Sequence, residues 1–199
     1  MLNAKALSEL LSKNSDERLC KRWFLMTPNG TLLAYNQPTH IRDLRRQAAK
    51  AALVWQEHQG TQYPDSAAAD GLDASKISMP ALLRTLTIEA DDANLIIRKL
   101  QPQLLLVLEG GVPPRKQTFE PRVTPEGPGD ATYPTQGGQS SGSAFGSSAS
   151  SIAESAKSSV SQGVLGLQRR KLDALASAIA QNFEQTGFKM PEEGSTKIF

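Results

Sequence analysis

One stretch, Thr39–His58, constrains the fold more than any other, because its apolar side chains recur with helical spacing. A buried helix face is predicted from the three- and four-residue steps between Ile41, Leu44, Ala48, Ala51, Ala52 and Trp55. At roughly 100° per residue, Ala49 and Leu53 fall beside this face, so the apolar arc is wider than packing on one sheet requires. Two interpretations follow. The helix is either a wide core helix of a monomer, or it packs on its own sheet and offers its other, short-chained side to a second backbone.

Segments on both sides of this helix predict three helices and five strands in all. The other two helices are expected at Ala4–Lys13 and Val164–Gln185. Strands are expected at Leu19–Met26, Thr31–Tyr35, Ala81–Glu89, Ala93–Leu100 and Gln103–Leu108. The turn sequence TPNG at residues 27–30 joins the first two strands into a hairpin, because Pro presets φ and both Asn and Gly tolerate left-handed backbone. The unbroken apolar run of the last strand predicts a central strand covered on both faces.

Composition divides the chain into one folded unit and three other segments. Residues 1–108 and 164–187 are expected to form a single domain, since about 120 residues suffice for one core. Residues 59–78 are interpreted as a mobile loop insertion, and residues 188–199 as a flexible tail. Residues 109–163 are rich in Pro, then in Ser and Gly, and ordering them would cost roughly 1–2 kcal/mol per residue with little apolar surface to bury. This insertion is therefore expected to be disordered.

Charge, cysteine content and hydropathy exclude several classes of protein. The net charge is +2 and the sequence pI is near 8.7, which predicts no binding to nucleic acid. The single cysteine, Cys20, excludes an internal disulfide and suits a reducing compartment. The longest apolar run, Leu104–Leu108, is far shorter than the ~20 residues of a membrane span. Because lipidation motifs are also lacking, we expect no direct membrane insertion and any membrane association to come through a partner.

No set of residues matches a catalytic or metal-binding motif. Cys20 lacks the histidine framework of a cysteine nucleophile and is expected to be a buried strand residue. His40 and His58 bracket the long helix and cannot bind one metal from a single turn. The sequence therefore predicts no catalysis, no cofactor and no metal, and it favours a binding protein. Four basic residues lean to one side of the long helix and are either solvated or face an acidic partner: Arg42, Arg45, Arg46 and Lys50.

A family resemblance rests on MLNAKALSELLS at the N-terminus, PNGTLLAY, ALVWQEH, ANLIIRKLQPQLLLVL and GLQRRKLDALASAIAQNF. In this order the stretches resemble the roadblock family of small α/β dimerisation modules, which includes dynein light-chain relatives. The N-terminal residues look most like the roadblock subunit of Ragulator, the late-endosomal/lysosomal adaptor of MAPK and TOR signalling. The insertions at 59–78 and 109–163 are longer than in the animal-type subunit and resemble a fungal-type member.

The resemblance implies that the single domain is roadblock-like. Its α+β fold would be a five-stranded antiparallel sheet with the long helix on one face and the first and last helices on the other. Roadblock modules pair through their long helices and the edge strand that follows, so that one sheet runs across two subunits. Carried over to this sequence, the partner-binding residues are Ala49, Ala52, Leu53, Gln56, Leu82, Leu86 and Ile88, the last three in or beside the edge strand.

The resemblance also implies a function and a place in the cell. The chain would be a non-catalytic scaffold subunit of a Ragulator-like guanine-nucleotide exchange factor complex, paired with a second roadblock subunit. A lipidated scaffold subunit would hold it at the late-endosomal, lysosomal or vacuolar membrane, where it helps recruit Rag-type GTPases in TOR nutrient signalling. The alternative is a dynein-associated or other small-GTPase-regulating roadblock dimerisation module. A third hypothesis, from a different class, is an enzyme that uses Cys20.

Overall fold

The computed structural model describes residues 2–60, 83–112, 121–127 and 151–191. Within these ranges the chain forms three helices and six strands. In chain order they are α1 (Ala4–Lys13), β1 (Cys20–Met26), β2 (Leu32–Tyr35), α2 (Ile41–Gly60), β3 (Thr85–Glu89), β4 (Ala93–Gln101), β5 (Leu104–Gly111), β6 (Arg122–Glu126) and α3 (Ser151–Thr186). Every helix and strand predicted from the sequence is present; α1 has the predicted ends, and each other element differs from its prediction at one or both ends.

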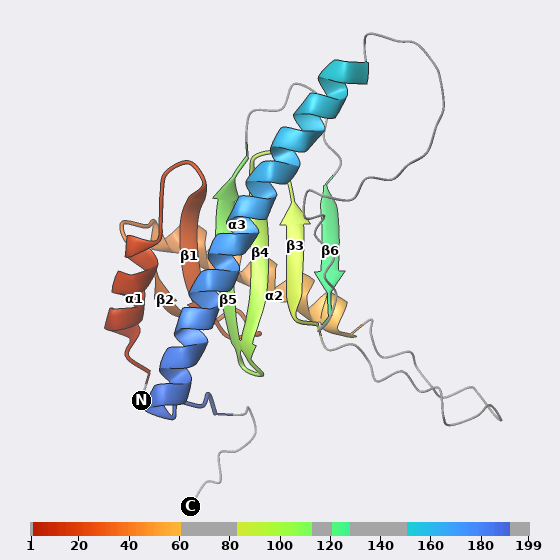
Figure 1. The fold of residues 1–199 in the computed structure, drawn as a ribbon. Coiled ribbons are helices and arrows are strands. Elements are labelled where there is room, and N and C mark those ends of the chain that lie inside the picture. The colour runs from red at the N-terminus through yellow and green to blue at the C-terminus, as the bar shows by residue number, and fades with distance from the viewer. Residues whose placement is uncertain (1, 61–82, 113–120, 128–150, 192–199) are drawn as a thin grey trace, which may run out of the picture.

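The six strands form one antiparallel sheet in the order β2-β1-β5-β4-β3-β6 (Figure 1). β1 and β2 form the predicted hairpin, with Leu25 opposite Ala34. The expected antiparallel α+β sheet is confirmed, but the predicted count of five strands was wrong, because β6 pairs with all of β3. β6 is five residues long and contains a proline, so its own sequence gives little strand signal. β6 forms because it pairs with β3, which is distant in sequence.

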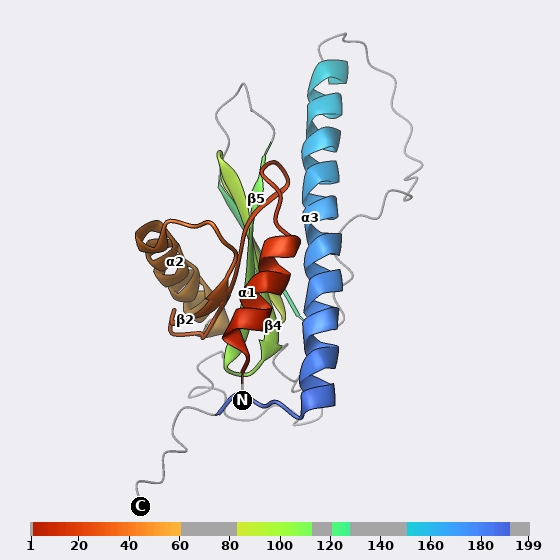
Figure 2. The ribbon, with the colours of Figure 1, turned by 90° about the vertical axis from the view of Figure 1, so that its left-hand side faces the viewer.

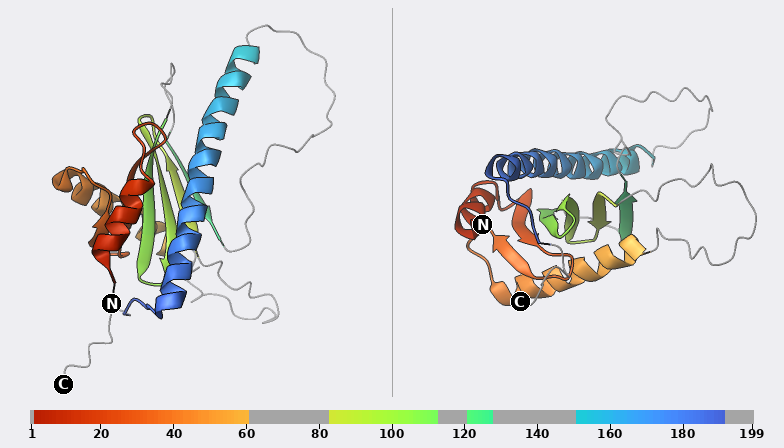
Figure 3. Two further views of the ribbon diagram at one scale, coloured as in Figure 1. Left: turned by 60° about the vertical axis from the view of Figure 1, so that its left-hand side comes forward. Right: turned by 90° about the horizontal axis from the view of Figure 1, so that it is seen from below.

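The helices cover the sheet as expected, with α2 on one face and α1 and α3 on the other (Figures 2 and 3). β5 shows why both faces need cover. Leu104, Leu106 and Leu108 belong to the cluster under α1 and α3, Leu105 and Val107 belong to the cluster under α2, and all five are 0% exposed. β5 is thus the central strand that its unbroken apolar run predicts.

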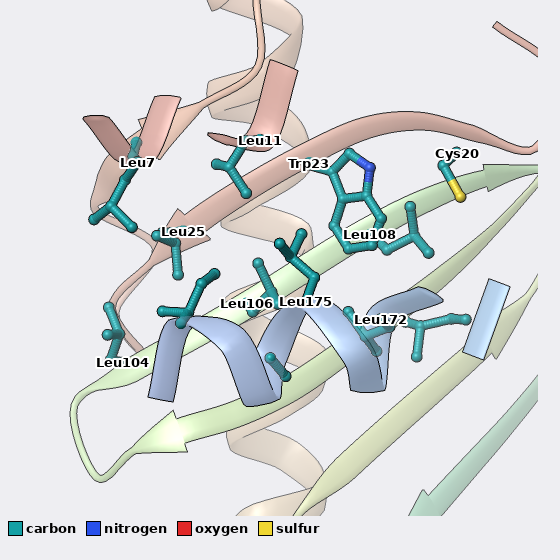
Figure 4. Packing of buried hydrophobic residues seen from close by; sticks show 14 of the residues in the cluster. Leu7, Leu11, Cys20, Trp23, Leu25, Leu104, Leu106, Leu108, Leu172 and Leu175 are labelled. Atoms are coloured by element: carbon teal, nitrogen blue, oxygen red, sulfur yellow. The ribbon is translucent and has the colours of Figure 1, made fainter. Parts of the chain in front are cut away.

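The core beneath α1 and α3 is built around Trp23 of β1 (Figure 4). Leu11 of α1 and Leu172 of α3 belong to the same apolar cluster as this indole, and all three side chains are 0% exposed. The indole N–H donates to the carbonyl oxygen of Asn14 at 3.0 Å, so the ring is buried without leaving its polar atom unpaired. This contact fixes the loop after α1 onto the sheet.

A buried amide, Gln168, ties α3 to the far end of the same face. Its side-chain nitrogen donates to the carbonyl oxygens of Leu19 at 3.0 Å and Gly111 at 2.7 Å. Its side-chain oxygen accepts from Nδ2 of Asn94 at 2.9 Å. Gly110 makes this approach possible, because a Cβ atom at that position would lie 2.2 Å from Nε2 of Gln168.

The structure corrects the prediction of disorder for residues 109–112, 121–127 and 151–163, whereas the rest of the segment 109–163 lies outside the described residues. β5 continues to Gly111, β6 occupies part of this segment, and α3 begins at Ser151 rather than at Val164. Average composition does not register a short strand whose partner lies far away in the sequence. Most of the predicted loop insertion and of the predicted tail lies outside the described residues.

Replacing Trp55 tests how α2 is fixed to the sheet. Its side chain is 0% exposed, so Trp55→Ala should lower the free energy of unfolding by about 3–5 kcal/mol through the cavity it leaves. Urea denaturation followed by circular dichroism measures the loss. The control is Leu53→Ala on the exposed side of the same helix, which should change the free energy of unfolding by no more than about 0.5 kcal/mol. Equal losses for the two variants would contradict this division of α2.

Candidate partner-binding surface

The candidate surface lies on α2, whose inner side is fixed to the sheet. Leu44, Ala48, Ala51 and Trp55 are each at most 1% exposed and belong to one apolar cluster. Steps of three and four residues bring these positions to one side of an α-helix. The buried side predicted from the sequence is therefore confirmed, except that Ile41 in the first turn is 37% exposed.

The flank beside this buried side is occupied by the chain's own β1–β2 turn. Gly30 in that turn has a φ of +88°, and a Cβ atom placed on it would lie 3.4 Å from the Cβ of Ala52. One turn further along α2, the side-chain nitrogen of Gln56 donates to the carbonyl oxygen of Pro28 at 3.1 Å. The short side chains of this helix predict that a second backbone approaches it closely. On this flank a backbone segment of the same chain contacts Ala52 and Gln56, and their predicted role in binding a partner stays a prediction.

The side of α2 turned away from the sheet carries an exposed leucine. Leu53 is 67% exposed, more than any other large apolar side chain among the described residues. Ala49, one turn earlier, is exposed as well. Four exposed basic residues precede or flank them: Arg42, Arg45, Arg46 and Lys50. We call these six residues the outer face of α2, an apolar spot next to a cationic half-helix.

The remaining predicted partner-binding residues lie elsewhere. Leu86 is 0% exposed in the core under α2, and Ile88 is partly buried against the same core. Leu82 lies outside the described residues. Ala49 and Leu53 of the predicted set therefore lie together on the outer face, whereas the Leu86 side chain is committed within the chain. The binding role of the set stays a prediction.

The strand predicted to be at the edge of the sheet is not at the edge. β3 pairs with β4 on one side and with β6 on the other (Figure 1). The family resemblance implies that this strand extends the sheet into a second subunit, but in this chain residues 122–126 occupy its outer side. The cause is the insertion between β5 and α3, which returns a strand to β3.

A buried ion pair that was not predicted from the sequence joins β6 to α3 beside β3. Both terminal nitrogens of Arg169 on α3 donate to the Glu126 carboxylate, with Nη1 3.0 Å from Oε1, and Nη1 lies 3.3 Å from the Thr87 hydroxyl. Glu126 is 5% and Arg169 is 9% exposed. Asp173 lies 3.6 Å from Nε of Arg169 and 3.3 Å from Nη1 of Arg98 on β4. The i,i+4 spacing of Arg169 and Asp173 was the one available sequence signal for this cluster.

Cys20 lies in β1 and is 0% exposed. Burial raises the pKa of its thiol to about 11, because the cost of removing the thiolate from water outweighs the opposing effect of Lys171. The thiol therefore stays protonated at neutral pH. This environment is that of a structural cysteine, as the sequence predicts. The histidines lie near opposite ends of α2, with Nδ1 of His40 3.0 Å from Asp43 and Nδ1 of His58 2.9 Å from the carbonyl oxygen of Val54.

Among the described residues, no three side chains of His, Cys, Asp or Glu are grouped as a metal site requires. Across the same residues, every helix is too short or too polar to span a membrane.

Comparison with solved structures identifies the fold. MglB of Myxococcus xanthus aligns over 96% of this chain and 97% of its own, with 13% sequence identity and a TM-score of 0.51. The Roadblock/LC7 domain from Streptomyces avermitilis aligns over 53% of this chain and 76% of its own, at 12% identity and a TM-score of 0.40. The gliding protein MglB from Thermus thermophilus aligns over 54% and 73%, at 16% identity and a TM-score of 0.41. No protein-family model and no curated protein sequence matches this chain. The chain thus has a roadblock-like α+β fold.

Alkylation tests the environment of Cys20. Near pH 8, iodoacetamide should leave the folded chain unlabelled over the time in which it labels the urea-unfolded chain completely. The folded thiol is buried with its pKa raised to about 11, whereas the thiol of an unfolded chain has a pKa of about 8.5. Mass spectrometry counts the adducts. Labelling of the folded chain at the unfolded rate would contradict burial and would favour a reactive cysteine.

Proposed function

We propose that this chain is a non-catalytic scaffold subunit that forms a dimer through the outer face of α2. The observation that carries this proposal is the exposed Leu53 in the middle of that helix. A leucine at 67% exposure, with the short Ala49 one turn away, is a place where a second helix can bury apolar surface. The inner side of α2 is already packed on its own sheet, and the outer face is the exposed side that carries Leu53.

The charge of α2 favours a partner that differs from this chain. The helix contains four basic residues and two acidic ones, Asp43 and Glu57, and so has a net charge of +2. Two copies of this helix would repel each other across an interface, whereas an acidic or neutral helix would not. A heterodimer with a second roadblock-family subunit, whose long helix is less basic, suits both the apolar spot and the cationic half-helix.

At a finer level we propose that the heterodimer belongs to a Ragulator-like complex. A lipidated scaffold subunit attaches this complex to the cytoplasmic face of the late-endosomal, lysosomal or vacuolar membrane. The heterodimer supplies part of the platform that recruits Rag-type GTPases in TOR nutrient signalling. The support for this level is the N-terminal stretch MLNAKALSELLS followed closely by PNGTLLAY, together with the roadblock-like fold.

A second candidate function keeps the fold and changes the complex. In it the chain is a dynein-associated or other small-GTPase-regulating roadblock dimerisation module. It is supported by the fold shared with MglB of Myxococcus xanthus, which extends over nearly the whole of both chains. The two candidates differ in their partners and not in their use of α2.

Purification of the full chain from its own cells, followed by mass spectrometry, separates the two candidates. A second roadblock-family protein with Rag-type GTPases and a lipidated subunit is the result expected for the Ragulator-like complex. Recovery of dynein chains or of another small GTPase supports the second candidate instead. A chain that sediments as a monomer at micromolar concentration in the presence of every co-purified protein would contradict both.

Replacing Leu53 by arginine tests the proposed interface. Leu53→Arg adds a charge to the apolar spot, and we expect the Kd for the roadblock-family partner to rise about 30-fold or more, the effect of losing a ~2 kcal/mol hot spot. The circular dichroism spectrum and the urea midpoint should stay unchanged, because the side chain is 67% exposed. The control is Leu167→Arg on α3, where the leucine is 50% exposed on the other side of the sheet. Equal loss of binding in both variants would contradict α2 as the binding surface.

A further inference from the structure

We propose that β6 closes the sheet within the chain, so that the partner binds the outer face of α2 without adding a strand to β3. The statement about the partner rests on the heterodimer proposed above, whereas the closure is a property of the chain alone. It changes the expected mode of binding. A sheet that runs from β3 directly into a second subunit requires a free outer side of β3, and this chain fills that side itself.

The register of β6 on β3 decides which backbone groups face outward. Pro125 lies opposite Leu86, and Thr124 lies opposite Thr87. In an antiparallel ladder, every second pair of residues exchanges both backbone hydrogen bonds. Proline has no N–H to exchange, so the Leu86–Pro125 pair is of the other kind and the nitrogen of Pro125 faces away from β3.

The outer side of β6 is poor in hydrogen-bond donors. Backbone groups two residues apart in a strand face the same way, so the outward nitrogens are those of Pro121, Val123 and Pro125. Val123 is therefore the single outward N–H donor over residues 121–125. A strand added here would meet one donor where an ordinary edge of this length offers three. Proline on an edge strand prevents extension of a sheet, and here two prolines flank the exposed position.

Contacts at its C-terminal end hold β6 in place. Arg169 binds both carboxylate oxygens of Glu126, and the backbone N–H of Arg84 donates to the Glu126 carbonyl oxygen at 2.8 Å. Displacement of β6 by a partner's strand would break a buried, bidentate ion pair and separate its two charges, which is strongly unfavourable. β6 is thus built to stay on β3 when a partner binds.

The partner that fits the outer face of α2 brings a helix. Leu53 and Ala49 offer a small apolar contact, and the basic residues beside them offer positive charge. The matching surface is a helix with a short apolar stripe bordered by acidic side chains.

A disulfide between β3 and β6 tests the closure. Ile88 lies opposite Val123, in a pair of the same kind as Leu86 and Pro125, where Cα atoms are about 4.5 Å apart and within the span of a disulfide. The variant Ile88→Cys/Val123→Cys is made with Cys20→Ser so that no other thiol competes. We expect the disulfide to form within one chain, and the oxidised and reduced forms to bind the co-purified roadblock-family partner with the same Kd. Non-reducing electrophoresis with peptide mapping follows the disulfide, and titration calorimetry measures the Kd.

The control pairs Thr87→Cys with Val123→Cys, which is one residue out of register with the side chains on opposite faces, and it should remain reduced. Failure of the Ile88–Val123 disulfide to form would overturn the closure. Binding that is lost on oxidation and restored on reduction would overturn the proposal about the partner, because β6 would then have to leave β3. If the wild-type chain binds no roadblock-family protein, the proposed heterodimer fails, while an intrachain disulfide still supports the closure.

Replacing both prolines tests whether they prevent another strand from pairing with the outer side of β6. Pro121→Thr/Pro125→Thr restores two outward N–H donors, and Leu53→Arg in the same chain removes association through α2. We expect this chain to gain concentration-dependent self-association in analytical ultracentrifugation that Leu53→Arg alone lacks. Identical sedimentation of the two chains would overturn the role assigned to the prolines.

Discussion

The backbone of β3 has hydrogen-bonding groups on two sides, and those on its outer side also need partners. How the chain provides these partners decides which surface is left for another protein. Thr85, Leu86 and Thr87 are 0% exposed, so the strand lies deep in the sheet and not at a solvated margin. An open edge at such a strand would be a template for pairing with any other chain. The chain fills this edge with five of its own residues, and the surface left exposed beyond them belongs to β6.

The ion pair between Glu126 and Arg169 explains why β6 takes one register. A buried ion pair is weak evidence for added stability, because desolvation offsets much of the attraction. Its geometry is nevertheless specific, since both nitrogens of the guanidinium meet both oxygens of the carboxylate. A slip of one residue would turn Glu126 to the face covered by α2, where the core is apolar, and would leave Arg169 without this partner. The charge cluster therefore fixes the position of a strand whose own sequence does not.

The elements that could be predicted from the sequence are those whose signal is local. Periodicity located the buried side of α2 at Leu44, Ala48, Ala51 and Trp55, and an unbroken apolar run identified β5 as central. β6 carries no such signal, because it is short, contains Pro125 and depends on pairing across a large separation in sequence. Helical angles likewise show that one flank of α2 has short side chains, but not that the β1–β2 turn covers it. What covers a surface is a tertiary property, so the contacts of Ala52 and Gln56 with the chain's own turn could not be predicted from helical angles.

In the proposed heterodimer, the pairing of β6 with β3 limits the contacts that the interface can use. A specific interface usually buries about 1,600 Å² in total, and one exposed helix about 30 Å long supplies a narrow strip towards it. Without a strand shared at β3, few positions remain to discriminate between partners. The apolar contact at Leu53 and the charge beside it then contribute more to the specificity of binding. Charge complementarity acts chiefly on the rate of encounter and on the rejection of wrong partners. In the proposed heterodimer, the four basic residues on the first half of α2 would therefore disfavour a second copy of this chain and favour an acidic helix. Under this proposal, β3 is already paired within the chain, and the sequence of one helix face selects the partner.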